Sequence, residues 1–194
     1  MKRNLLAVAV LLITAPAYTQ NTTTMSLNAD AVAAGTLSGA WRVENDAIIG
    51  LAEAGQTAWL RLPGTFWDFA LELEFMTPAP ANGGVQIRGH WLPAAPADGP
   101  DPKTMYGYHV TINTLPSGWY RGHIVVTPGR ARHVFADSTG KVLFDPTYVR
   151  DSAEFQKTNK GRAPNFWRTD RGKITLQAMS GSVAFRNLKI RETK

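Results

Sequence analysis

The segment that decides the fold reads Ala70-Leu71-Glu72-Leu73-Glu74-Phe75. Apolar and acidic side chains alternate along it, and successive side chains of a β-strand point to opposite sides. The apolar side chains are therefore expected to face a core, with Glu72 and Glu74 together on the other side. This pattern predicts a half-buried strand of an antiparallel sheet.

Two further segments, residues 84–88 and 108–113, show the same alternation. Their apolar positions are expected to be buried. Their outward positions are polar: Gln86, Arg88, His109, Thr111 and Asn113. Together with the two glutamates, the three strands are expected to offer one polar face. A solvated sheet face is the commoner explanation of alternation alone, but Glu, Arg, Gln and His on adjacent strands resemble a sugar-binding groove.

Short segments with β-type alternation recur from residue 41 onward, separated by turn-rich stretches, and this pattern predicts an all-β sandwich or barrel. The expected strands are residues 41–43, 47–51, 58–62, 69–75, 84–88, 108–113, 123–126, 173–177 and 182–190. Residues 92–103 contain several prolines and are expected to form a loop, because proline cannot donate to a central strand ladder.

The N-terminus has the features of a secretory signal peptide. Lys2 and Arg3 precede an apolar run from Leu5 to Ile13, and Ala15-Pro16-Ala17 is a small-x-small cleavage pattern. The apolar run is far shorter than the roughly 20 residues that span a bilayer. We expect a signal peptide at 1–17, a polar leader at 18–39 and one domain at 40–194. The mature protein is then periplasmic or secreted, without stable membrane insertion.

Composition excludes several classes of site. The chain has no cysteine, so it has neither a disulfide nor a thiol nucleophile. Its net charge of +6 falls to +4 when Lys2 and Arg3 leave with the signal peptide. The basic residues are scattered, so we expect a solvated basic face and no nucleic-acid partner. The four histidines are too far apart in the sequence to form a recognised metal-binding motif, so the sequence does not tell whether the protein binds a metal. No cofactor is expected.

Several motifs occur in an order that resembles a known family. They are Trp41 with 46–50, then 67–75, 82–88, 107–112, 174–177 and 183–190. From Trp41 to Arg191 the chain resembles the 3-keto-disaccharide hydrolase domain family, also described as 3-keto-glucoside lyase/hydratase domains. The resemblance implies a concanavalin-A-like jelly-roll sandwich of two antiparallel sheets, with the polar face lining a concave saccharide groove.

The chain departs from the family pattern in two places. The family has Tyr-Glu-Val-Gln-Ile followed by Asp where this chain has Tyr108-His109-Val110-Thr111-Ile112-Asn113. Residues 120–177 are also shorter than the corresponding family region, so one or two strands of the sandwich are expected to be missing or remodelled.

The family chemistry implies an elimination. A 3-keto group acidifies the proton at C2 of a glycoside, so that a base can remove it while an electrophile holds the developing enolate. The resemblance nominates His109 or Glu74 as the base and Arg88 as the electrophile. The residues expected to bind the saccharide are Glu72, Gln86, Thr111, Asn113, Trp119, Tyr120 and Gln177.

Purely structural roles for these residues, and other functions, are also consistent with the sequence. Glu74 and Arg88 could form an exposed cross-strand pair of little energy, and a lone histidine on a strand is usually a surface residue. A non-catalytic carbohydrate-binding jelly roll is the main alternative, in which Trp91, Trp119 and Tyr120 would stack on sugar rings. Ordinary glycoside hydrolysis by Glu72 and Glu74 ranks third, because the laminarinase-type Glu-x-Asp-x-x-Glu strand is absent.

Overall fold

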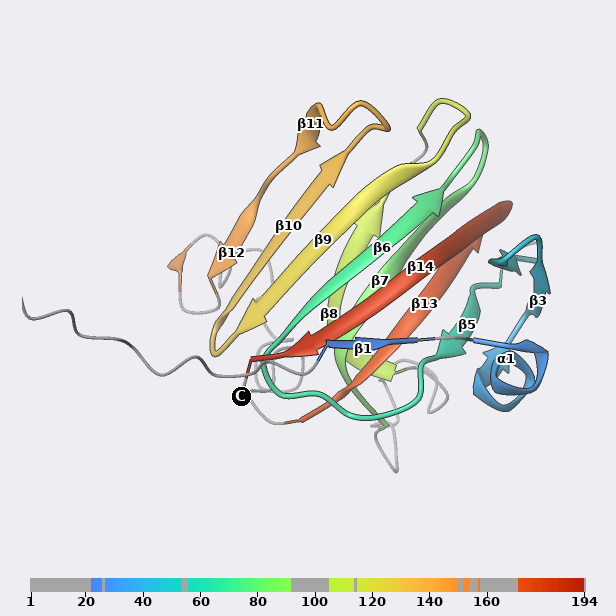
Figure 1. Cartoon of the computed structure of the whole chain (residues 1–194). Coiled ribbons are helices and arrows are strands. Elements are labelled where there is room, and N and C mark those ends of the chain that lie inside the picture. Colours follow the sequence, from blue (N-terminus) through green and yellow to red (C-terminus); the bar gives the residue numbers. More distant parts are fainter. Residues whose placement is uncertain are drawn as a thin grey trace, which may run out of the picture.

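The computed structural model describes residues 22–25, 27–53, 56–91, 105–113, 115–149, 152–153, 157 and 171–193. They form a β-sandwich of two antiparallel sheets (Figure 1). The nine-stranded sheet has the order β11 (Val142–Phe144), β10 (Arg130–Ala136), β9 (Tyr120–Thr127), β6 (Phe69–Met76), β14 (Ser182–Glu192), β4 (Ala47–Leu51) and β3 (Ala40–Glu44), with β1 (Thr22–Thr24) beside β14 and β12 (Thr147–Val149) beside β10.

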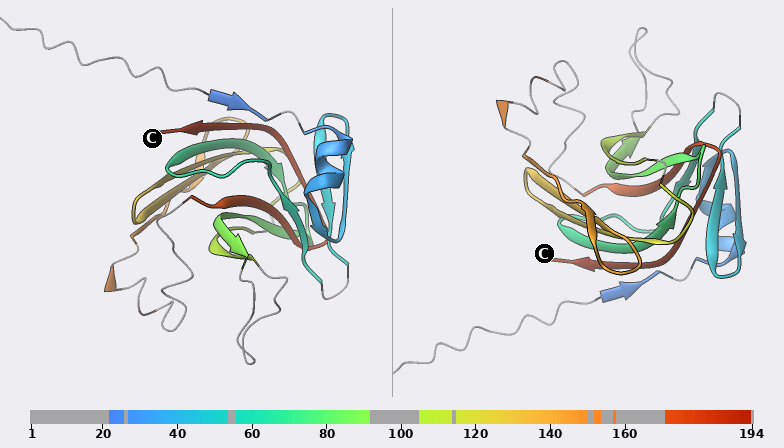
Figure 2. Two further views of the ribbon diagram at one scale, coloured as in Figure 1. Left: turned by 90° about the horizontal axis from the view of Figure 1, so that it is seen from below. Right: turned by 90° about the horizontal axis from the view of Figure 1, so that it is seen from above.

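The five-stranded sheet has the order β2 (Thr36–Ser38), β5 (Ala58–Arg61), β13 (Lys173–Ser180), β7 (Asn82–Trp91) and β8 (Met105–Ile112). Figure 2 shows the two sheets as stacked layers that curve in the same direction, with the five-stranded sheet on the inside of the curve. The outer face of the five-stranded sheet is therefore concave. The predicted all-β sandwich of two antiparallel sheets is confirmed.

The core lies between the layers and is built by the alternation that the sequence shows. Leu71 and Phe75 of β6 are fully buried, as are Val85 and Ile87 of β7. Each fully buried side chain of this size contributes about 1.5–3 kcal/mol relative to its exposed state. This burial fixes which side of each strand faces inward, and hence which polar side chains face outward.

Residues 22–38 are part of the fold, whereas the sequence analysis began the domain at residue 40. β1 pairs with the end of β14, and β2 pairs with β5. Between them lies the helix α1 (Ala29–Gly35), where Asn28 Oδ1 accepts a hydrogen bond of 2.9 Å from the Ala31 amide. Val32 is only 2% exposed. Two turns of helix are too short to give a periodic pattern, which is why the sequence analysis missed this segment.

The expectation that one or two strands of the family pattern are missing or remodelled stays a prediction, but residues 120–149 form four strands, of which only residues 123–126 were expected. β9 and β10 form a hairpin around Pro128 and Gly129, and Gly129 has a positive φ of 72° that favours glycine. β11 and β12 then pair with β10. The missed strand β10 buries Ala131, His133 and Phe135. Because the inward position 133 is a histidine, the apolar alternation of β10 is interrupted, and the sequence pattern did not predict this strand.

The predicted signal peptide and the predicted loop at 92–103 lie outside the described residues. Among the described residues, no helix is long and apolar enough to cross a membrane.

Candidate functional site

The three strands that were expected to share one polar face belong to different sheets. β6 lies in the nine-stranded sheet, whereas β7 and β8 are neighbours in the five-stranded sheet. Glu72 and Glu74 therefore face away from the core on one side of the sandwich, and His109 faces away on the other. Packed sheets lie about 10 Å apart. The expected common face is wrong, because alternation identifies the outward side of a strand but not the sheet that the strand joins.

Strand register places eight residues in two adjacent rows on the concave side. Gln86 lies opposite His109 and Gly84 opposite Thr111, across β7 and β8. On the other side of β7, β13 places Thr175 opposite Gln86 and Gln177 opposite Gly84. β5 extends each row by one residue. We call these residues the concave face: Arg61, Thr175, Gln86 and His109 in one row, and Trp59, Gln177, Gly84 and Thr111 in the other.

His109 is the titratable centre of the concave face. Its Nδ1 lies 3.2 Å from Thr111 Oγ1. Its Nε2 is buried and has no hydrogen-bond partner. Burial lowers the pKa of His109 to about 4, because the charged imidazolium loses hydration, and the neighbouring Gln177 side chain partly opposes this. His109 is therefore neutral at pH 7, and the Gln177 side chain is a polar group close enough to affect its titration.

Gly84 makes room for this imidazole. A Cβ atom at residue 84 would collide with His109 Nε2 and would lie 2.7 Å from the Val110 carbonyl oxygen. The requirement for glycine here is a close approach, since Gly84 is not among the glycines with positive φ. The ring nitrogen consequently reaches over β7 in the direction of β13.

Gln177 supplies a second polar atom without a partner. It is 3% exposed, and its Oε1 has no hydrogen bond. A buried amide oxygen that lacks a donor costs free energy unless a ligand or water supplies one. Gln177 and His109 lie on the two strands that flank Gly84, so their side chains are neighbours on the concave face.

Trp59 and Arg61 complete the concave face at its β5 edge, and both side chains are half-buried. Residues 58–62 were predicted to form a strand, but no role was predicted for these two side chains or for Thr175. The alternation Ala58-Trp59-Leu60-Arg61 contained the signal, because Ala58 and Leu60 are buried in the core. The sequence does not show that β5 pairs with β13, and this pairing places both side chains in the two concave rows.

The position of the side chain of Arg88, the predicted electrophile, is not described. Arg88 belongs to β7, but its side chain lies outside the described residues, as does that of Trp91. The register of β7 shifts between Ile87 and His90, so the backbone forms a bulge at this point. A cross-strand pair between Arg88 and Glu74 is excluded, because their strands are not neighbours.

The other predicted binding residues lie away from the concave rows. Tyr120 is 8% exposed and points into the core, where it stacks on Phe75 and donates a hydrogen bond to the Pro116 carbonyl. Trp119 packs against Arg186, with the guanidinium carbon 3.9 Å from the ring centroid. Asn113 is exposed just after β8. The prediction that Tyr120 stacks on a sugar is wrong, since its ring is a core side chain.

Glu72 and Glu74 line an open depression of about 650 Å³ on the outer face of the nine-stranded sheet. Glu74 Oε2 accepts hydrogen bonds from Arg186 Nε at 2.6 Å and from Asn187 Nδ2 at 3.1 Å. Strand register also sets Glu72 opposite Lys189. Both carboxylates lie opposite basic residues of the neighbouring strand. Such cross-strand pairs stabilise the sheet, which explains these glutamates without a catalytic role.

No metal centre is evident in the described part of the chain, where no three His, Asp or Glu residues are grouped to hold an ion. The concave rows offer an imidazole, two amides and hydroxyl groups. Such groups can hydrogen-bond the hydroxyls of a sugar and can accept a proton at one atom, His109 Nε2.

Comparisons with known proteins agree with this architecture. The sequence profile of the 3-keto-alpha-glucoside-1,2-lyase-like domain matches residues 27–191. A search of the curated proteins found no match. A protein of Parabacteroides distasonis, provisionally named a glycosyl hydrolase, is 17% identical with a TM-score of 0.57, over 81% of this chain and 85% of its own.

Two other solved structures share the fold at lower identity. A Crh5 transglycosylase in complex with NAG is 9% identical with a TM-score of 0.51, over 89% of this chain and 84% of its own. Peanut lectin is 8% identical with a TM-score of 0.50, over 88% of this chain and 97% of its own. At these identities the likenesses concern the fold alone.

Proposed function

The chain belongs to the 3-keto-alpha-glucoside-1,2-lyase-like domain family, and from this premise we propose that its concave face binds a 3-keto-glycoside and cleaves it by elimination and hydration. The observation that carries the proposal is the neutral imidazole of His109, with a buried Nε2 that has no partner, beside the unpartnered amide oxygen of Gln177. A base and a hydroxyl acceptor on one concave sheet face are what this chemistry requires.

The proposed reaction balances without an external oxidant or reductant. His109 Nε2 removes the proton from C2, and the electron pair of the C2–H bond moves to the C3 carbonyl oxygen as an enolate. The enolate then expels the aglycone oxygen from C1, and that oxygen takes up the proton that His109 removed from C2. Water adds its hydroxyl to C1 of the resulting enone and a proton returns to C2, so the net change is hydrolysis.

Thr111, Gln177 and Arg88 each have a distinct part in this scheme. Thr111 Oγ1, at 3.2 Å from Nδ1, orients the His109 ring. Gln177 Oε1 accepts a hydrogen bond from a sugar hydroxyl. Arg88, nominated by the family resemblance, would stabilise the enolate oxygen. Glu74 is not the base in this scheme, because it lies on the other sheet in an ion pair with Arg186.

One observation favours a second candidate, a carbohydrate-binding module without turnover. A pKa of about 4 makes His109 a weak base, and the five strands of the concave sheet contain no Asp or Glu to replace it. Binding by amides, hydroxyls and the Trp59 ring would need no base. The absence of Asp and Glu from these five strands also argues against an ordinary glycosidase on this face, since that chemistry needs a pair of carboxylates.

The test uses the chain without residues 1–17 and 4-nitrophenyl 3-keto-glucosides of both anomers. Release of 4-nitrophenol measures cleavage, and loss of the C2 proton signal in D2O measures proton abstraction. We expect both in the wild type, and a loss of about 10²- to 10⁴-fold in His109→Ala, the usual value of a general base. Glu72→Gln, an exposed change on the other sheet, is the matched control and should keep full activity.

Three results would overturn the enzymatic proposal. The first is saturable binding of a keto-glucoside without cleavage or C2 exchange, which would establish the binding module. The second is cleavage of unmodified glucosides as fast as keto-glucosides, because their C2 proton is not acidic. The third is full activity in His109→Ala.

A further inference from the structure

The sheet that carries the concave face has a one-sided charge. Its five strands contain three cationic residues, Arg61, Arg88 and Lys173, and no Asp or Glu. The outer face of the other sheet is different, since there Glu74 forms an ion pair with Arg186. Cationic side chains on a sheet whose own strands supply no carboxylate are suited to an anionic ligand.

Arg61 is the clearest of these cations. Its side chain is half-buried, and it makes no side-chain hydrogen bond or ion pair within the described part of the chain. Partial burial weakens the hydration of a guanidinium without supplying a replacement, so an incoming carboxylate or phosphate would gain a charge-assisted hydrogen bond.

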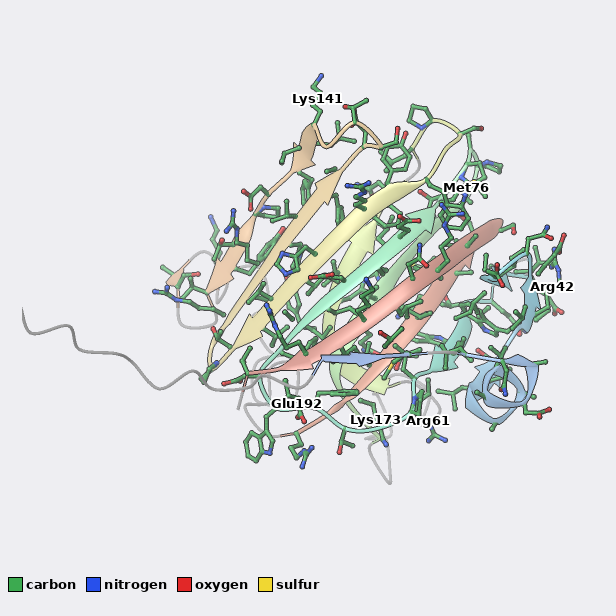
Figure 3. All side chains as sticks on the ribbon, viewed as in Figure 1. Arg42, Arg61, Met76, Lys141, Lys173 and Glu192 are labelled. Atoms are coloured by element: carbon green, nitrogen blue, oxygen red, sulfur yellow. The ribbon has the colours of Figure 1, made fainter. Side chains whose placement is uncertain are left out.

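Lys173 lies beside Arg61 and adds to the positive electrostatic potential at this edge of the concave face. Arg61 is opposite Thr175 in the register, so Lys173, two residues earlier on β13, is its diagonal neighbour at about 7–8 Å. Lys173 Nζ donates to the Gly64 carbonyl at 2.9 Å, which positions the ammonium group but does not neutralise it. Figure 3 shows both side chains at the same end of the molecule, with Lys141 at the opposite end.

The distance from His109 to Arg61 suits a second group on the same ligand. They are the two ends of one row, separated by three strand spacings of about 4.8 Å each, or about 14 Å in total. A glycoside with C2 at His109 would extend its aglycone along this row. Trp59, next to Arg61 on β5, offers an aromatic ring beside the path.

We propose that the substrate is a glycoside with an anionic aglycone, whose negative group is held by Arg61 with Lys173 while the sugar lies at His109. This inference rests on the proposed function, and it names the substrate class of the same site. Arg61 and Lys173 are then specificity-determining residues, since neither is near enough to act on C2.

The experiment compares two matched aglycones, 4-hydroxybenzoate and 4-hydroxybenzyl alcohol, which differ in the negative charge of one group. Their 3-keto-glucosides are assayed for kcat/KM. Their unmodified glucosides, which cannot eliminate, are used as ligands in calorimetry. We expect at least about a tenfold preference for the carboxylate in both measurements, as for a hydrogen bond to a charged group. The preference should shrink as salt is raised.

Three variants locate the effect. Arg61→Gln should abolish the preference for the carboxylate aglycone, both in kcat/KM of the 3-keto-glucosides and in calorimetric affinity of the unmodified glucosides, whereas Arg61→Lys should retain part of it. Lys141→Gln, at the far end of the molecule, should leave it unchanged. A circular dichroism spectrum of each variant checks folding, and Arg61→Lys keeps the test valid if the glutamine variant does not fold.

The outcomes separate this inference from the proposed function. Cleavage of both keto-glucosides at equal rates, or a preference that survives in Arg61→Gln, overturns the inference and leaves the function standing. Cleavage of neither, with calorimetric preference for the carboxylate glucoside, overturns the enzymatic function and supports the anionic ligand. Equal calorimetric affinities contradict the inference whatever the activity.

Discussion

Acidification should destabilise the fold through one residue of the core, His133. This side chain on β10 is 2% exposed, and its ring centroid lies 5.2 Å from that of Tyr148 and 5.5 Å from that of Tyr108. Its Nε2 has no hydrogen-bond partner. Burial, together with a smaller effect of the nearby His109, lowers the pKa of His133 to about 4. The folded protein therefore holds this imidazole in its neutral form.

The sign and size of the effect follow from the two pKa values. The unfolded chain has a His133 pKa of about 6.5 and binds a proton more readily than the folded protein. The contribution to stability is complete above pH 6.5, is lost as the pH falls from 6.5 to 4, and is constant below. A difference of about 2.5 pKa units corresponds to about 3 kcal/mol, or about 10 °C in melting temperature for a chain of this size.

His133→Phe isolates this contribution, because phenylalanine keeps a ring against Tyr148 and cannot be protonated. Urea unfolding of the wild type and the variant at pH values between 4 and 7.5 gives the difference in their unfolding free energies. Titrating groups that do not interact with His133, such as Asp137 and Asp145, occur in both proteins and cancel, whereas His109, which acts on His133, is followed separately by NMR. We expect the variant to gain about 3 kcal/mol relative to the wild type between pH 7.5 and pH 4. A difference that stays constant with pH, or a His133 NMR titration near pH 6.5, would refute the reasoning.

Further predictions concern the site, the core and export. The pH profile of kcat/KM for a 3-keto-glucoside should lose activity near pH 4, where His109 becomes protonated, and a loss centred near pH 6.5 would show that the base is another group or an exposed histidine. Gly84→Ala should displace the His109 ring and lower turnover about 100-fold or more, with a KM change smaller than the kcat change, because a misplaced catalytic group affects the chemical step. Tyr120→Ala should cost about 3–5 kcal/mol in urea unfolding as a core truncation, and a stable variant with weakened saccharide binding would contradict this. Mass spectrometry of the exported protein should show a new N-terminus at residue 18, so an intact Met1 on the exported form would sink the signal-peptide prediction.

Local alternation allowed most of the strands to be predicted. Residues 47–51 were predicted as a strand with the bounds that β4 has, and the predicted strand at 69–75 differs from β6 by one residue. The inward side chains of β6 were also identified correctly. These predictions succeeded because a strand with one buried face must alternate, whatever its neighbours are.

The candidate site was predicted only in part. His109, Thr111, Gln86 and Gln177 were named from the sequence, and the structure brings these four together on the concave face. Glu72 and Glu74 were placed with them by the same alternation, and the structure separates them. Strands with the same alternation of apolar and polar residues can join either sheet of a sandwich. The sheet that a strand joins depends on backbone hydrogen bonds to residues far away in the chain.

The sequence by itself determined the all-β class, the outward side of β6, β7 and β8, and the family, because these depend on side-chain periodicity and motif order within short segments. Only the tertiary structure decided that β13 lies between β5 and β7. That pairing places Trp59 and Arg61, more than a hundred residues before Gln177, in the same rows as Gln177 and His109. Backbone hydrogen bonds between strands carry no side-chain signature, so residues that meet across a sheet are found only when the chain is folded.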